Sequence, residues 1–148
     1  IKNQYVGAGE TGSIEMTRSL GTDYPVGIVA NTYDPVIWPG APEYHTKYTT
    51  ALKAFLKDEY GSSWAIQGYE GILALAAGVK KANNIEAEKV SKALMGITFD
   101  TPIGPQTIRP KDHSANRGQF WGKIVRTSAY PFPVMESVSY TDPTPFMD

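Results

Sequence analysis

The sequence predicts an α/β fold, because short strand-like apolar runs and longer amphipathic helical patterns alternate along the chain. In order, these segments follow the succession β-α-β-α-α-α-β-β, which indicates an α/β architecture. The 148 residues are 41% hydrophobic and 20% charged, the usual balance of a globular protein. A chain of this length is one domain's worth and can bury a hydrophobic core.

Charge and residue usage exclude several kinds of partner and site. The formal net charge of −1 gives no reason to expect a nucleic acid or an anionic membrane surface as partner. The chain has no cysteine, which excludes disulfides and cysteine-based zinc sites. The longest weakly polar run, 72–79, is far too short to span a bilayer. Because the chain starts at Ile1 without a methionine, we expect an N-terminal portion to precede it.

The first elements are a strand end, a glycine-rich loop and a short helix. Val6 closes the strand and leads into the loop 7–12. Ser13 is a residue type that caps helix N-termini, so we expect a short helix over 14–20. Gly21 is expected to end that helix.

The middle of the chain is predicted to contain a buried strand and two long helices. The apolar run 25–30 favours a strand, and the proline-rich segment 31–42 favours a loop. Helical periodicity predicts a helix over 43–60, ended by Gly61. A second helix is predicted over 63–82, and its apolar stripe and small residues indicate that it is largely buried.

The last part of the chain changes from helix to extended structure. Asn84 is expected to cap a third helix over 85–95. The segment 97–109 is predicted to be turn and extended chain, and 119–126 a strand. The tail from Tyr130 contains four prolines, so we expect it to run extended along a surface.

The loop Gly7–Gly12 matches the pattern G-x-G-x-x-G, which binds a pyrophosphate when it joins a strand to a crossover helix. Asp34 even follows near the position of a ribose-binding acid. Against a dinucleotide, Glu10 would place a carboxylate beside the phosphates, the following helix is short, and Asp34 lies in a proline-rich loop. An ordinary strand-to-helix turn and a loop that binds a small ligand are the other two interpretations.

No set of residues predicts catalysis or metal binding. The two histidines, His45 and His113, have no second metal ligand one turn away, and we interpret both as surface residues. Asp112 precedes His113, but neighbours in a polar turn rarely form a functional dyad. Four aromatic residues near element ends either pack in the core or line a cleft, where they would grip a small solute: Tyr33, Trp38, Trp64 and Tyr69.

Five segments follow one another in an order that a known family shares. The loop 6–10 (VGAGE) and the strand 25–28 (PVGI) precede the long stretch 64–82 (WAIQGYEGILALAAGVKKA). The segments 90–94 (VSKAL) and 99–105 (FDTPIGP) come after it. This succession resembles that of the branched-chain amino-acid-binding proteins, which are type I periplasmic solute-binding proteins of ABC transporters.

The resemblance covers most of residues 5–125 and implies a type I periplasmic-binding-protein-like fold. The chain would be the C-terminal part of a two-lobed, three-layer α/β/α protein, whose lobes close on a ligand around a hinge. Residues 1–30 would hold the end of lobe 2 and a crossing strand, and 31–100 the C-terminal helices of lobe 1. Residues 101–148 would be closing strands and an extended tail. Half of the cleft would belong to the N-terminal part of the same protein.

The function that the resemblance implies is reversible capture of a small solute in the interlobe cleft, for an ABC permease in the membrane. The solute would be an amino acid, an amide or a small organic or aromatic acid, bound without a cofactor or metal and without catalysis. The periplasm, or another extracytoplasmic location, would be the place of action. A ligand sensor of the same fold and a nucleotide-dependent, Rossmann-like enzyme built on Gly7–Gly12 are the alternatives.

The candidate ligand-binding residues follow from the same resemblance. The family's G-x-E-G loop gives Glu10, with Gly9 and Thr11 beside it, and in amino-acid binders that acid meets the ligand ammonium. Thr11 stands where the family usually has a glycine. A tyrosine near the start of the family's helix matches Tyr69, which would contact the ligand's side-chain end. Tyr33 is added because it follows a predicted strand.

Titration with NAD, NADP and ATP separates the solute-binding hypothesis from the nucleotide-dependent enzyme. A loop with Glu10 at its centre should repel phosphates, so we expect no saturable binding of any of the three in isothermal calorimetry. Saturable binding of a nucleotide would favour the enzyme.

Overall fold

The computed structural model describes residues 5–147, which form two compact units. The first unit holds the described residues up to Ile66 together with Gly118–Thr141. The second unit holds Gln67–Arg117 and the described residues from Asp142 onward. The chain therefore passes from one unit to the other three times.

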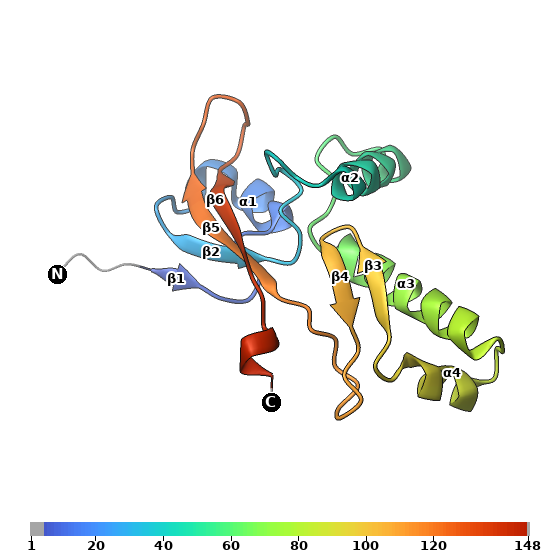
Figure 1. Ribbon diagram of the computed structural model, residues 1–148. Coiled ribbons are helices and arrows are strands. Elements are labelled where there is room, and N and C mark those ends of the chain that lie inside the picture. The colour runs from blue at the N-terminus through green and yellow to red at the C-terminus, as the bar shows by residue number, and fades with distance from the viewer. Residues whose placement is uncertain (1–4, 148) are drawn as a thin grey trace. The chain divides into compact units, whose positions relative to one another are not determined.

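The first unit is built on a four-stranded mixed sheet (Figure 1). Its strand order is β1 (Val6–Gly7), β2 (Val29–Thr32), β5 (Gln119–Val125) and β6 (Val134–Thr141). β1 and β2 are parallel, whereas β2–β5 and β5–β6 are antiparallel. The parallel pairing places the C-terminal ends of β1 and β2 at the same edge of the sheet. The segments that follow these two strands therefore lie together.

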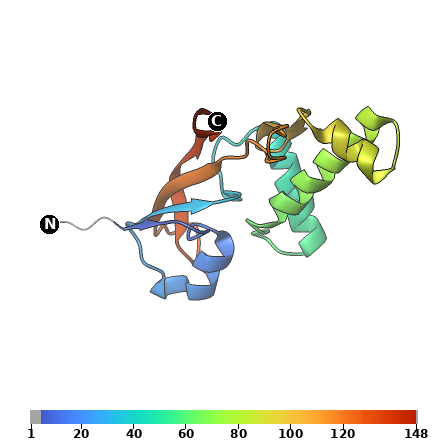
Figure 2. The ribbon, with the colours of Figure 1, turned by 90° about the horizontal axis from the view of Figure 1, so that it is seen from below.

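Helix α1 (Ile14–Leu20) begins and ends as the sequence predicts, and it lies beside one face of the sheet (Figure 2). The side chain of Ser13 accepts a hydrogen bond from the N–H of Met16, and Gly21 is the C-cap. A short 3₁₀ helix, Gly21–Asp23, follows. The core beneath α1 is apolar, made by Ile14, Val36, Phe132 and Val134, and a second cluster comprises Tyr24, Ala30, Ile124 and Met135.

Ser62 and Ser63, which lie in a loop of the first unit, are hydrogen-bonded to the start of α1. The N–H of Ile14 donates to the hydroxyl oxygen of Ser63 at 3.1 Å. In return, the Glu15 carboxylate accepts the Ser62 hydroxyl at 2.6 Å and the Ser63 N–H at 3.0 Å. The bond from Ile14 satisfies an N–H group that the first turn of α1 leaves without an intrahelical partner.

Helix α2 (Glu43–Leu56) ends before the predicted limit at residue 60, and Gly61 does not end it. Lys57 adopts the left-handed conformation, with φ 53°. Asp58 then accepts the N–H groups of Tyr60 and Gly61, and these bonds, together with one from Arg18, hold the pKa of its carboxyl below the ordinary value. An aspartate that bonds to nearby backbone N–H groups offers the chain an alternative to the helix.

The second unit contains α3 (Ala65–Ala82, which begins in the first unit), α4 (Ala87–Leu94) and a two-stranded hairpin of β3 (Thr98–Thr101) and β4 (Gly104–Thr107). The hairpin lies within 97–109, the segment that the sequence predicts to be turn and extended chain. A 3₁₀ helix, Thr144–Phe146, lies near the C-terminus.

Helix α3 is not largely buried, contrary to the prediction. Ile72 is 66% exposed and Leu75 49% exposed. Among the glycines of α3, Gly78 is closely packed. There, a Cβ on Gly78 would lie 2.7 Å from the Leu94 side chain of α4. α4 is a short helix, so along α3 most of the apolar stripe has no cover from the described residues.

Three other boundaries differ from the sequence-based expectations. β2 covers 29–32 instead of 25–30, and α4 starts two residues late because Asn84 accepts the N–H of Glu86 in a turn and does not cap the helix. β6 is a paired strand where a surface tail was expected. The prolines of that tail lie before and after β6, so none interrupts its hydrogen bonds.

No helix within residues 5–147 has the length and apolar character needed to cross a membrane.

Replacing Gly118 by alanine should destabilise the fold, because its Cβ would lie 1.9 Å from the carbonyl oxygen of Thr141. Overpacking against backbone cannot be relieved by rotating a side chain, so we expect the free energy of unfolding to fall by about 2–3 kcal/mol. Urea unfolding followed by circular dichroism measures this change.

Gly68→Ala in α3 is the matched control, since no atom lies within 4 Å of its Cβ position. Removing a helix-interior glycine should raise stability by about 0.5–1 kcal/mol. Equal effects of the two substitutions would contradict the steric argument.

Candidate functional site

The glycine-rich loop after β1 is folded tightly onto the end of β2. The N–H of Gly12 donates to the carbonyl oxygen of Asn31 at 2.7 Å, and a Cβ on Gly12 would lie 2.9 Å from that oxygen. Thr11 donates its hydroxyl to the carbonyl oxygen of Gly7 at 2.7 Å, and Tyr24 donates its hydroxyl to the carbonyl oxygen of Thr11. Burial raises the pKa of the Tyr24 hydroxyl above its ordinary value. Gly12 thus allows the close approach of two backbone segments.

Glu10 turns its side chain inward at this loop. It is only 9% exposed and has a positive φ of 70°. Its Oε2 atom accepts the backbone N–H of Tyr33 at 3.0 Å and the hydroxyl of Thr32 at 3.3 Å. Its own N–H donates to Oδ1 of Asn31 at 3.2 Å. A buried carboxylate that receives these hydrogen bonds is a fixed acceptor, suited to a cationic or hydrogen-bond-donating partner.

The predicted ligand-binding residues fall into two groups. Gly9, Glu10, Thr11 and Tyr33 lie together in the first unit, where the parallel pairing of β1 and β2 brings the two segments side by side. Tyr69 lies on α3 in the second unit, where it is 39% exposed. Their role in binding stays a prediction.

A buried pair, Asp34 and His45, is the part of this region that the sequence analysis missed. His45 Nε2 lies 2.6 Å from Asp34 Oδ1, and the two side chains are 2% and 0% exposed. The interpretation of His45 as a surface residue is therefore wrong. The pairing arises because the loop after β2 folds back over the first turns of α2, and helical periodicity carries no information about such a long-range contact.

The second histidine is on the surface, as predicted. His113 is exposed in a turn, with a positive φ of 60°. Its neighbour Asp112 accepts the N–H of Ser114 and forms an ion pair with Arg109. Both interactions lower the pKa of the Asp112 carboxyl. Asp112 thus pairs within its own turn and does not orient a catalytic histidine.

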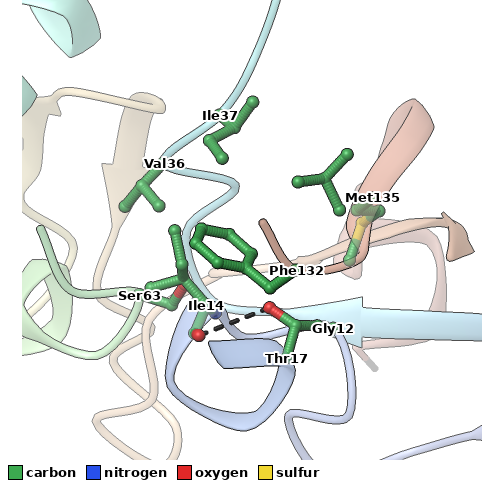
Figure 3. A pocket seen from close by; sticks show the side chains of 9 residues that line it. Gly12, Ile14, Thr17, Val36, Ile37, Ser63, Phe132 and Met135 are labelled. Atoms are coloured by element: carbon green, nitrogen blue, oxygen red, sulfur yellow. Dashed lines mark hydrogen bonds between the residues drawn. The ribbon is translucent and has the colours of Figure 1, made fainter. Parts of the chain in front are cut away.

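Figure 3 shows a pocket between α1, the loop after β2 and the segment before β6. Its volume of about 20 Å³ holds roughly one water molecule. The pocket is therefore too small for an amino acid. Its lining is mostly apolar: Gly12, Ile14, Thr17, Val36, Ile37, Ser63, Phe132, Val134 and Met135.

The geometry also bears on the nucleotide and metal hypotheses. Asp34 is fully buried against His45, so its carboxylate is not presented to a ribose. The side chain of Thr11 fills the space over Gly7, where a phosphate would approach the backbone. Within the described part of the chain, no three His, Cys, Asp or Glu residues are grouped in a way that could hold a metal ion.

Comparison with known proteins gives one family match. A model of the periplasmic binding protein family matches residues 3–128. A leucine-, isoleucine-, valine-, threonine- and alanine-binding protein of Pseudomonas aeruginosa is 29% identical over 103 residues, which cover 68% of this chain and 26% of that protein. The chain thus spans about a quarter of the length of this relative.

Solved structures show the same fold. A branched-chain amino-acid transporter of the ABC type from Rhodopseudomonas palustris is 22% identical, with a TM-score of 0.73 over 93% of this chain and 35% of the other. A solute-binding protein from the same species, in complex with 3,4-dihydroxybenzoic acid, is 19% identical, with a TM-score of 0.74 over 96% of this chain and 39% of the other.

Asn31→Ala should loosen the glycine-rich loop. Asn31 is 6% exposed and accepts the N–H of Glu10, while its amide donates to Gln119 at 3.2 Å. Leaving these buried groups without partners should lower the free energy of unfolding by about 1–3 kcal/mol. Asn84→Ala, in an exposed turn, is the matched control and should change it by about 0.5 kcal/mol or less. Equal losses in urea unfolding would show that the Asn31 contacts hold nothing in place.

Proposed function

Because the chain belongs to the periplasmic binding protein family, as a member of the type I branched-chain amino-acid-binding class, we propose that it forms part of the solute-binding component of an ABC importer. The component captures a small solute reversibly in a cleft and releases it to the permease. The observation that carries this proposal is the buried Glu10 carboxylate, held by Tyr33 and Thr32 at the end of two parallel strands. Family membership implies an extracytoplasmic location.

The charge of Glu10 favours a solute with an ammonium group. A carboxylate at 9% exposure attracts a cation more strongly than one in water, because the surrounding medium screens it less. The amino-acid specificity in the name of the Pseudomonas aeruginosa relative agrees with such a ligand. The dihydroxybenzoate bound by the Rhodopseudomonas palustris relative supports an aromatic acid as the second candidate. An acid would have to keep its own carboxylate away from Glu10.

The cleft that we propose lies between the two lobes of the whole protein, and its N-terminal part would supply half of it. Residues 1–30 would belong to the end of lobe 2 and a crossing strand, and 31–100 to the C-terminal helices of lobe 1. Residues 101–148 would be closing strands and an extended tail.

Catalysis forms no part of the proposal. Affinity would rest on preorganised hydrogen bonds and one charge in a desolvated cleft.

A thermal-shift screen of the full-length protein against amino acids, aromatic acids and amides tests solute capture. A ligand that binds only the folded state raises the melting temperature in proportion to the logarithm of its concentration. We expect at least one amino acid to raise it. A screen in which no solute of these classes shifts the melting temperature would contradict the proposal.

Glu10→Gln should weaken the binding of an amino acid by about 2–5 kcal/mol, because the ammonium would lose its charged partner in a buried site. Calorimetric titration with L-leucine and with 3,4-dihydroxybenzoate measures this loss. Glu43→Gln is the control, since the Glu43 side chain is 81% exposed on α2, and it should leave the dissociation constants unchanged. Tighter binding of the benzoate by Glu10→Gln, with no change for leucine, would contradict the ammonium contact.

A further inference from the structure

The loop after β2 is joined to α2 by one buried polar contact. Asp34 comes from the loop and His45 from the first turn of α2, and Nε2 of the imidazole lies 2.6 Å from Oδ1 of the carboxylate. Both side chains are more than nine-tenths buried. Separating Asp34 from His45 would cost both buried groups this hydrogen bond. The pair therefore strongly favours a single position of the loop.

Aromatic rings enclose the imidazole and fix its orientation. Trp38 meets the His45 ring edge-on, with centroids 5.0 Å apart, and packs equally against the fully buried Phe120 at 4.9 Å. The ring of Tyr48 lies 6.3 Å away on the next turn of α2. Such edge-to-face packing restricts the histidine ring to one rotamer.

The pair is connected directly to the candidate ligand-binding residues. Asp34 follows Tyr33, whose backbone N–H donates to the Glu10 carboxylate at 3.0 Å. The Thr32 hydroxyl lies 3.3 Å from Oε2 of Glu10 and 3.3 Å from the carbonyl oxygen of Asp34. Any displacement of Asp34 therefore moves the two groups that hold the carboxylate of Glu10.

We propose that Asp34 and His45 act as a positioning pair, which holds the backbone of residues 32–34 so that Glu10 is preorganised for its ligand. Neither side chain touches the ligand in this proposal. The effect on ligand binding rests on the proposed function, whereas the effect on the loop does not. A purely structural pair would instead lower stability without a specific effect on the Tyr33–Glu10 contact.

Two substitutions at residue 45 separate these possibilities. His45→Phe keeps a ring in the aromatic enclosure but removes the donor to Asp34. His45→Gln places an amide N–H at nearly the position of Nε2 and can restore that donation. Val90→Ala, at a buried residue of α4 in the second unit, is the control for a general loss of stability.

Amide hydrogen exchange in the full-length protein gives a readout that needs no ligand. The exchange rate of the Tyr33 N–H is compared with that of Ile124, whose N–H donates to Ile28 within the same sheet. His45→Phe should raise the exchange rate of Tyr33 relative to that of Ile124 by about tenfold, which corresponds to the loss of roughly one hydrogen bond. His45→Gln should restore most of the protection of the Tyr33 N–H. An unchanged ratio in His45→Phe, or an equal rise in Val90→Ala, overturns the proposal.

Titration with L-leucine then tests the consequence for binding. The dissociation constant should rise about tenfold in His45→Phe and stay within about threefold of the wild-type value in His45→Gln. Failure of the unmodified protein to bind leucine or any solute of the screen overturns the proposed function, and the exchange ratio still decides whether the pair positions the loop. Binding that is unaffected by His45→Phe, despite a rise in exchange, overturns the positioning role.

Discussion

The arrangement of the candidate site depends on one buried negative charge, the Glu10 carboxylate, and on the backbone that surrounds it. A carboxylate that is only 9% exposed is unfavourable unless hydrogen-bond donors replace the water it has lost. The N–H of Tyr33 and the hydroxyl of Thr32 provide these donors, and both come from the end of β2. The parallel pairing of β1 and β2 is what places the loop and these donors at the same sheet edge. The strand pairing thus brings the buried charge the donors that it requires.

Gly12 of the loop has a steric role in this arrangement. Gly12 lies so close to the carbonyl oxygen of Asn31 that a side chain would collide with it, and the same asparagine accepts the N–H of Glu10. The pattern G-x-G-x-x-G is typical of a phosphate-binding turn. In this chain it allows the loop, with its carboxylate, to approach the end of β2. The identical letters G-x-G-x-x-G serve either purpose, so only the neighbours of the loop decide between them.

Local features of the sequence predicted local structure well. Ser13 and Gly21 predicted both ends of α1, and the apolar run that became β5 was predicted within one residue. Two predictions failed for different reasons. A local turn, in which Asp58 accepts the N–H of Tyr60, follows the early end of α2. A distant contact, the pairing with β5, makes the proline-flanked tail the strand β6. Within the candidate site, Glu10 was predicted from the resemblance and Tyr33 from its position after a strand, and their role in binding stays a prediction. The Asp34–His45 pair was missed, because it forms only when a loop returns to a helix eleven residues along the chain.

The most direct test of the account is a crystal structure of the full-length protein with its solute bound. The account predicts a solute whose ammonium or other donor lies within about 3 Å of the Glu10 carboxylate, with the Tyr33 N–H still bonded to the same side chain. A solute held elsewhere, with the Glu10 carboxylate contacting only its own loop, would contradict the central claim.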